Sequence, residues 1–223
     1  MLPYSLEAWF SLIARMNADL AVFVVIALLL GLFVLALTWW PTLADHKNPA
    51  AIDRRVGLAL AAGWIAAGAV FHGQYLEPMF FGAPWLMALF IVQGLLLATV
   101  AFVHPLAGNG AVTPMVWLGR ALMAYGLLGM PLVDLLLGPG WPAFRMVGLT
   151  PEAMTVFTCG WLLTRQPDWR LPLTALLPAA AGAWAGYQAL ALDWPIDWLV
   201  TLAAVGVLLA ALAGLLTRAR RSN

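Results

Sequence analysis

Long apolar segments without charge are the feature that most constrains this chain. Residues 20–39 contain no charged side chain and only one hydroxyl group. A membrane-spanning helix needs about 20 mainly apolar residues, because the hydrocarbon core of a bilayer is about 30 Å thick. Of the 223 residues, 64% are hydrophobic and 9% are charged, whereas a soluble domain carries about 25% charged residues. These values exclude an ordinary water-soluble domain and a disordered chain, so we expect a protein that is surrounded mainly by lipid.

Seven segments are candidates for helices that cross the membrane. Prolines, glycines and charged residues separate them, as is typical of loops. The expected spans are residues 20–39, 54–71, 79–103, 114–137, 150–164, 171–192 and 196–216. The fifth is short, because 15 residues at 1.5 Å each reach only about 22 Å. The expected fold class is an all-α membrane protein, a seven-transmembrane-helix bundle that forms one integral membrane domain over residues 1–223.

Basic residues are divided unequally between the two faces that this span count defines. One face holds Arg15 and Arg145, and Arg120 lies inside the fourth span. The other eight basic residues lie in loops of the opposite face or in the C-terminal tail, namely Lys47, Arg54, Arg55, Arg165, Arg170, Arg218, Arg220 and Arg221. Because short cytoplasmic loops are enriched in Lys and Arg, we expect the C-terminus in the cytoplasm and the N-terminus outside.

Acidic residues show the reverse distribution. The expected outer face holds seven of the ten, Glu7, Asp19, Glu77, Asp134, Glu152, Asp193 and Asp197. With two basic residues, this face has a net charge of −5, and eight basic with three acidic residues give the inner face +5. One interpretation is an outer vestibule that attracts cations. The alternative is that the acids only keep the outer loops soluble.

An amphipathic helix is expected before the first span, over residues 4–17. Its apolar residues Leu6, Trp9, Phe10, Ile13 and Met16 recur at helical spacing, and Ser5, Glu7, Ser11 and Arg15 occupy the other face. This pattern is typical of a helix that lies in the membrane interface. The same apolar stripe also suits packing against the bundle or against another subunit.

The segment 71–78 between the second and third spans combines four chemically useful side chains. His72, Gln74, Tyr75 and Glu77 place imidazole, amide, phenol and carboxylate within six residues. Histidine titrates near neutral pH and also binds metals, so this segment is the leading candidate for a solute, ion or proton site. The alternative is a histidine that is hydrogen-bonded in a turn. One histidine and one carboxylate do not define a metal site.

Four polar residues within or beside the spans are further candidates, because ionisable groups inside a membrane are costly. Asp134 and Glu152 lie near the outer ends of their helices and are candidate ligands for a solute or cation. Gln93 is a candidate as well, although a buried amide also serves to link helices. Arg120 is expected to extend toward the headgroups or to form a structural pair. It lies about 21 Å from Asp134 along the helix, so these two residues do not pair.

Several chemistries lack the residues that they require. The only lysine, Lys47, lies in a loop, which excludes a retinal Schiff base, and the single cysteine, Cys159, excludes an internal disulfide. No pairing of a nucleophile with a base is recognisable, so an enzyme is not favoured and no cofactor is expected. The net charge of +1 gives no reason to expect a nucleic-acid partner. Small residues mark helix faces suited to a membrane-protein partner or a second copy, at Ala59/Gly63/Ala67, Gly182/Gly186 and Gly206/Ala210/Gly214.

Short motifs in the chain resemble those of an uncharacterised family of bacterial multi-span proteins, domain of unknown function 6064. They are residues 1–10, the Phe71-His72 pair with residues 80–82 and Gln93, and residues 148–158. The resemblance covers nearly the whole chain, implies a bacterial inner-membrane location and supplies no activity. Where related sequences tend to have Cys-Pro, this chain has Glu152-Ala153, so the resemblance does not imply metal or redox chemistry there.

Two functional hypotheses follow. The first is a transport-like protein that binds or moves a small solute or cation from an acidic outer vestibule. It predicts a hydrated cavity that reaches His72, Glu77, Asp134 and Glu152. The second is a non-catalytic accessory or assembly subunit of a larger membrane complex, which predicts a solid core and a stable partner.

Overall fold

The computed structural model describes residues 2–39 and 49–222. Helices make up most of this part of the chain, and an isolated bridge between Gly108 and Arg165 is the β-type contact found in it. The all-α class is therefore confirmed. The expected inner-face position of Lys47 falls outside the described residues.

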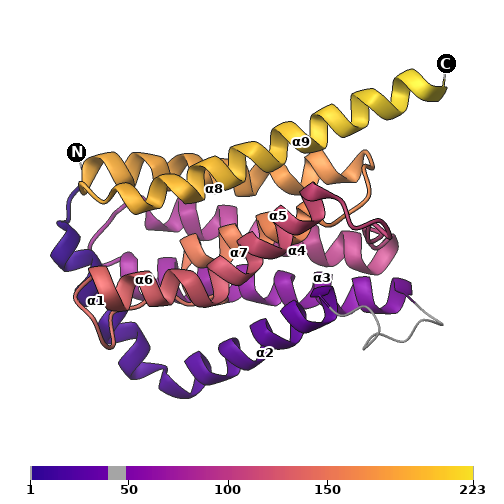
Figure 1. The fold of residues 1–223 in the computed structure, drawn as a ribbon. Coiled ribbons are helices and arrows are strands. Elements are labelled where there is room, and N and C mark those ends of the chain that lie inside the picture. Colours follow the sequence, from indigo (N-terminus) through magenta and orange to yellow (C-terminus); the bar gives the residue numbers. More distant parts are fainter. Residues whose placement is uncertain (1, 40–48, 223) are drawn as a thin grey trace.

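Five segments are long and apolar enough to cross a membrane, and together they form most of the bundle in Figure 1. Each corresponds to one of the expected spans. They are α2 (Ala21–Trp39), α3 (Pro49–Ala66) continued by η2 (Ala67–Leu76), α4 (Ala83–Val103), α5 (Pro114–Ala124) continued by η3 (Tyr125–Gly129) and α6 (Met130–Leu137), and η4 (Pro195–Asp197) continued by α9 (Trp198–Ser222). The elements η2 and η3 are π-helical.

The expected count of seven spans is not supported. Residues 150–164 and 171–192 do contain helices, α7 (Pro151–Leu163) and α8 (Arg170–Ala191), but neither is among the five candidates. The 13 residues of α7 reach only about 20 Å, which is less than the hydrocarbon thickness. α8 is long enough, but Ala, Gly, Pro and Thr take many of its positions. The expected orientation of the termini is not supported by these findings either.

α7 is enclosed by the other helices. All its residues from Pro151 to Leu162 are buried. Glycines on both sides allow the close approach: a Cβ atom on Gly119 of α5 would lie 2.5 Å from the carbonyl oxygen of Gly160, and one on Gly160 equally close to that of Gly119. Gly63 of α3 likewise leaves room for Met154, whose Sδ would be 2.8 Å from an added Cβ. Small residues thus bring the neighbouring backbones against a short central helix.

α8 and α9 form a closely packed pair. A Cβ on Gly182 would lie 2.4 Å from that of Ala204, and the Thr201 hydroxyl donates to the Gly182 carbonyl at 2.8 Å. Two of the three expected small-residue faces thus contact other helices of the same chain. Gly206 of the third has no described atom within 4 Å of an added Cβ, and its coverage by a partner remains a prediction.

The predicted amphipathic helix is present as α1 (Leu6–Asp19). The Ser5 hydroxyl caps it by accepting a hydrogen bond from the Ala8 N–H at 3.2 Å. Trp9, Ile13 and Met16 are buried, and the Trp9 ring meets Phe71 edge-on at 5.0 Å. The apolar face of α1 therefore packs on one end of the bundle. This arrangement is the alternative expected above to a helix that lies in the membrane interface.

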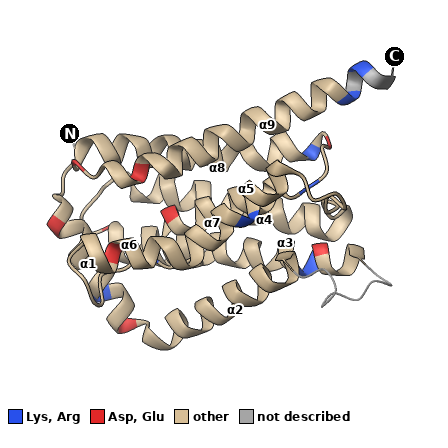
Figure 2. Cartoon of the chain, viewed as in Figure 1, with Lys and Arg blue, Asp and Glu red and all other residues tan. Residues whose placement is uncertain are grey.

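Charged residues are sorted between the two ends of the bundle (Figure 2). We call the end covered by α1 the acidic end and the end from which the C-terminal turns of α9 project the basic end. The described charged residues of the acidic end are Glu7, Arg15, Asp19, Glu77, Asp134, Arg145, Glu152, Asp193 and Asp197. Those toward the basic end are Asp53, Arg54, Arg55, Arg120, Arg165, Asp168, Arg170, Arg218 and Arg220.

Candidate functional site

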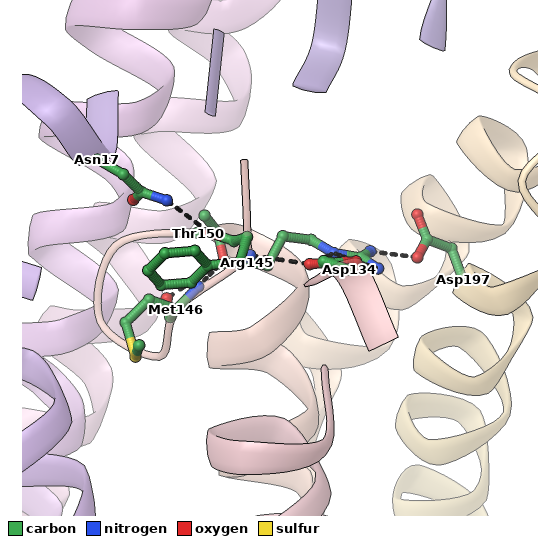
Figure 3. A network of polar contacts seen from close by, with 7 residues as sticks. Asn17, Asp134, Arg145, Met146, Thr150 and Asp197 are labelled. Atoms are coloured by element: carbon green, nitrogen blue, oxygen red, sulfur yellow. Dashed lines mark hydrogen bonds and ion pairs between the residues drawn. The ribbon is translucent and has the colours of Figure 1, made fainter. Parts of the chain in front are cut away.

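The loop of residues 138–150 between α6 and α7 turns back into the acidic end. Gly140 and Gly148 adopt φ values of +84° and +85°, which glycine accepts without steric cost. The Asn17 amide of α1 donates to the carbonyls of Pro142 and Phe144, both at 2.7 Å. The Thr150 hydroxyl accepts from the N–H of Met146 at 3.1 Å. These bonds hold the loop so that the residue between Phe144 and Met146 points into the bundle (Figure 3).

That residue is Arg145, and it is fully buried. Its backbone N–H donates to Oδ2 of Asp134 at 2.8 Å, and its Nε and Nη2 donate to the same carboxylate at 2.9 and 2.7 Å. Nη1 donates to Asp197. One guanidinium therefore joins the loop to α6 and to the start of the α9 segment (Figure 3).

The acidic partners of Arg145 stabilise its positive charge. Desolvation lowers the pKa of Arg145, but the nearby charges of Asp197 and Asp134 outweigh this effect and raise the pKa above its ordinary value. The group therefore stays positively charged at every pH that the fold survives. Because the two carboxylates are buried with it, the pair energies are not screened as they are at a surface.

Glu152 adds a third carboxylate to this interior. It lies in the first turn of α7, is 2% exposed, and its charge interacts with those of Asp197, Arg145 and Asp134. Its Oε2 atom is buried without a hydrogen-bond partner among the described residues. We call Asp134, Arg145, Glu152 and Asp197 the acidic cluster. It contains three acids and one base, so with all groups ionised it carries a buried net charge of −2.

A small cavity borders Glu152 on its other side. Its volume is about 20 Å³, and Thr155, Trp184 and Gln188 contribute to its lining. The Gln188 Oε1 and Trp184 Nε1 atoms also lack partners among the described residues, while Gln188 Nε2 donates to the Tyr4 hydroxyl at 3.1 Å. Burial raises the pKa of Tyr4, so this phenol stays protonated. The unpartnered polar atoms lie in a mainly apolar lining, and the cavity is large enough for about one water molecule.

An open pocket lies at the surface of the acidic end. It has a volume of about 500 Å³ and lies between α1 and the loop that follows α6, with Glu7 and Trp141 at its wall. Ala143 and Trp194 also line it, two residues before Arg145 and three before Asp197.

The predicted site residues separate into two groups. Asp134 and Glu152 meet in the acidic cluster. Gln74 and Glu77 are exposed at the surface, where the Tyr75 hydroxyl donates to Asp19 at 3.1 Å. These three residues take no part in the hydrogen bonds of the cluster.

His72 is close to these surface residues in sequence, but its side chain lies inside the bundle. It is 1% exposed, its ring meets those of Phe71 and Phe90 edge-on, and neither ring nitrogen has a hydrogen-bond partner among the described residues. The expected hydrogen-bonded turn histidine is therefore not observed. In the part of the chain that is described, no group of three His, Cys, Asp or Glu side chains is arranged to hold a metal ion.

The two remaining candidates connect helices. Gln93 is fully buried, and its Nε2 donates to the Thr174 carbonyl of α8 at 3.0 Å, as expected for an amide that links helices. Arg120 donates to the Thr38 carbonyl of α2 at 3.1 Å.

Sequence reasoning missed Arg145 and Asp197 as site residues. One feature pointed to Arg145: it is one of only two basic residues among seven acids on its face, and the apolar loop around it gives it no nearby carboxylate in sequence. Asp197 gave no comparable indication, because an acid in the first turn of a helix is ordinary.

Residues 6–222 match the family described as "Family of unknown function (DUF6064)". The chain belongs to this family. The predicted resemblance to DUF6064 is thereby confirmed, and the bacterial inner-membrane location remains a prediction. No curated protein and no solved structure matches the chain, so membership of DUF6064 brings no activity with it.

Replacing Arg145 tests whether the acidic cluster holds the fold together. R145M leaves Asp134, Asp197 and Glu152 buried without a positive partner, so we expect the free energy of unfolding to fall by about 3–5 kcal/mol. The matched control is R15M, because Arg15 forms an exposed pair with Asp19 at 3.7 Å, and such pairs contribute about 0–1 kcal/mol. The measurement is unfolding of the purified protein in detergent, followed by tryptophan fluorescence. Equal losses for the two variants would show that the buried pair is not a structural centre.

Proposed function

We propose that the protein is a membrane protein of transport type that takes up a cation, specifically a proton, at the acidic cluster. The observation that carries the proposal is the buried Oε2 atom of Glu152, which has no described partner although two further carboxylates share the single guanidinium of Arg145. The proposal retains the transport-like hypothesis but moves its site from the surface of the acidic end into the interior.

The charge count explains why a cation is needed. Burying an ionised group without a partner costs several kcal/mol, and a carboxylate close to like charges favours its protonated form. Asp134 and Asp197 are both bonded to Arg145, which leaves Glu152 as the acid of the cluster without an ion pair. Uptake of one proton by Glu152 halves the buried net charge of the cluster and provides a hydrogen-bond donor toward the cavity of about 20 Å³.

A proton fits this site better than a metal ion. The described residues offer no group of three acidic, histidine or cysteine ligands suited to a metal, and the cavity accommodates about one water molecule. The larger pocket at the acidic end, about 500 Å³, supplies water on the outer side of the cluster.

The second candidate is the accessory subunit of a membrane complex. Two observations favour it. The cavity beside Glu152 is small and closed in by side chains of α4, α7 and α8, and α9 offers an open face at Gly206 among the described residues. In that case the acidic cluster acts only as a structural ion network, and the protein moves no proton.

We also propose that α7 and α8 complete a seven-span bundle in a bacterial inner membrane, with the acidic end outside. The separation of charges in Figure 2 supports this orientation, because basic residues collect on the cytoplasmic side. The burial of α7 supports a crossing in which protein, rather than lipid, surrounds the short helix.

Proton movement through purified protein in liposomes distinguishes the two functions. Under an imposed membrane potential, we expect liposomes with the natural protein to acidify faster than empty liposomes, as reported by a trapped pH-sensitive dye. E152Q keeps the shape of the protonated acid but has no proton to exchange, so its rate should fall to that of empty liposomes.

E77Q is the matched control, because Glu77 is an exposed acid of the same end. It should retain the natural rate. A natural protein no faster than empty liposomes, or an E152Q variant as fast as the natural protein, contradicts the transport proposal and favours the accessory role.

Labelling of single cysteines tests the topology. Cys159 is buried and is first replaced by alanine; cysteines then replace Glu7, Asp193 or Gln166, all exposed. In intact bacterial cells, we expect an impermeant maleimide to label E7C and D193C but not Q166C until the membrane is opened. Labelling of Q166C from outside, or protection of D193C, would contradict the seven-span orientation.

A further inference from the structure

Arg120 is a half-buried cation toward the basic end for which the described residues provide no counter-ion. Its Nη2 donates to the Thr38 carbonyl, and its guanidinium lies 5.5 Å from the centre of the Trp117 ring. Its Nε is buried without a partner, and no described carboxylate lies within ion-pair distance of it. The nearest candidate in the same pocket, Asp53, is bonded to Arg165 and accepts from the Gly108 N–H at 3.2 Å.

The pocket that Arg120 lines is suited to an anion. Its volume is about 400 Å³, and its polar lining includes Thr38, Asp53, Asn109, Arg120 and Arg165. Because two guanidinium groups and one carboxylate line the pocket, its described lining has a net positive charge. Because Arg165 already has Asp53 as its partner, the uncompensated charge is that of Arg120.

An apolar groove begins one to two turns closer to the N-terminal end of α2. It has a volume of about 280 Å³ and lies between α2, α3 and α7, with Phe23, Leu30, Ala62 and Phe157 in its walls. The same helix thus lines the groove through residues 23–34 and the polar pocket through residues 37–38. From Leu30 to Thr38 the rise is about 12 Å.

The exposed surface of α2 shows that the groove faces the bilayer. Of the 19 residues in this helix, only Val24, Gly31 and Val34 are buried. Large apolar side chains such as Phe23 and Ile26 are 59% and 45% exposed, and in a span they contact hydrocarbon. A ligand that enters this groove comes from the lipid phase.

We propose that this site binds an anionic phospholipid. The phosphate lies in the pocket beside Arg120 and accepts hydrogen bonds from its guanidinium group, and one acyl chain follows the groove between α2 and α3. Guanidinium groups pair well with phosphate, and basic pockets between spans on the cytoplasmic side are known as headgroup sites. The apolar groove favours a lipid over free phosphate, because free phosphate would occupy the polar pocket and leave the groove empty.

Binding of defined lipids to the detergent-purified protein tests the site. Phosphatidylglycerol is titrated against phosphatidylcholine of the same chain length, with native mass spectrometry to count bound lipid. We expect phosphatidylglycerol to bind more tightly, and R120Q to weaken it about tenfold, equivalent to about 1.4 kcal/mol, by removing the charge-assisted bonds. A62F fills the groove without changing any charge, so it should also weaken the binding of phosphatidylglycerol. This second variant keeps the test valid if R120Q does not fold.

R55Q is the matched control, because Arg55 is exposed at the same end and does not line the pocket. It should bind phosphatidylglycerol as the natural protein does. The proposal is overturned if the two lipids bind equally, if R120Q and R55Q behave alike, or if A62F has no effect. Displacement of the lipid by millimolar inorganic phosphate would assign the pocket to the free anion instead.

Discussion

The bonds of Arg145 to Asp134 and Asp197 are the interaction on which the acidic end depends. They join a loop, the end of α6 and the beginning of the α9 segment through one guanidinium. A charged group in this position is unfavourable unless all its donors are used, so the loop is held in one conformation. Asn17 strengthens this arrangement from α1 by binding the carbonyls on both sides of Ala143.

The same interaction creates the condition for function, because it leaves Glu152 without a counter-charge. Two acids satisfy Arg145, and the third remains buried beside them. The basic end shows the opposite imbalance, since Asp53 satisfies Arg165 and leaves Arg120 without an acid. Each of the two sites thus contains one charged group without an ion pair among the described residues, Glu152 in the acidic cluster and Arg120 in the pocket of the basic end. We infer a proton from the water side at one end and a lipid phosphate at the other.

Local patterns in the sequence predicted most of the helices but little of the cluster. The apolar run 20–39 and the amphipathic stripe 4–17 correspond to α2 and α1, because hydrophobicity and its period are properties of neighbouring residues. The partnership of Arg145 with Asp197 joins residues 52 positions apart and depends on how the loop packs. Adjacency also misled: His72 and Glu77 are close in sequence, but one points into the bundle and the other lies on its surface.

Infrared difference spectroscopy of the membrane-reconstituted protein reports whether Glu152 carries a proton in the resting protein. The C=O stretch of a protonated carboxyl is distinct from the bands of a carboxylate and shifts in heavy water. We predict that the natural protein at neutral pH has such a band from a buried carboxyl and that E152Q lacks it. An identical band in E152Q, or only carboxylate bands in the natural protein, would contradict the account.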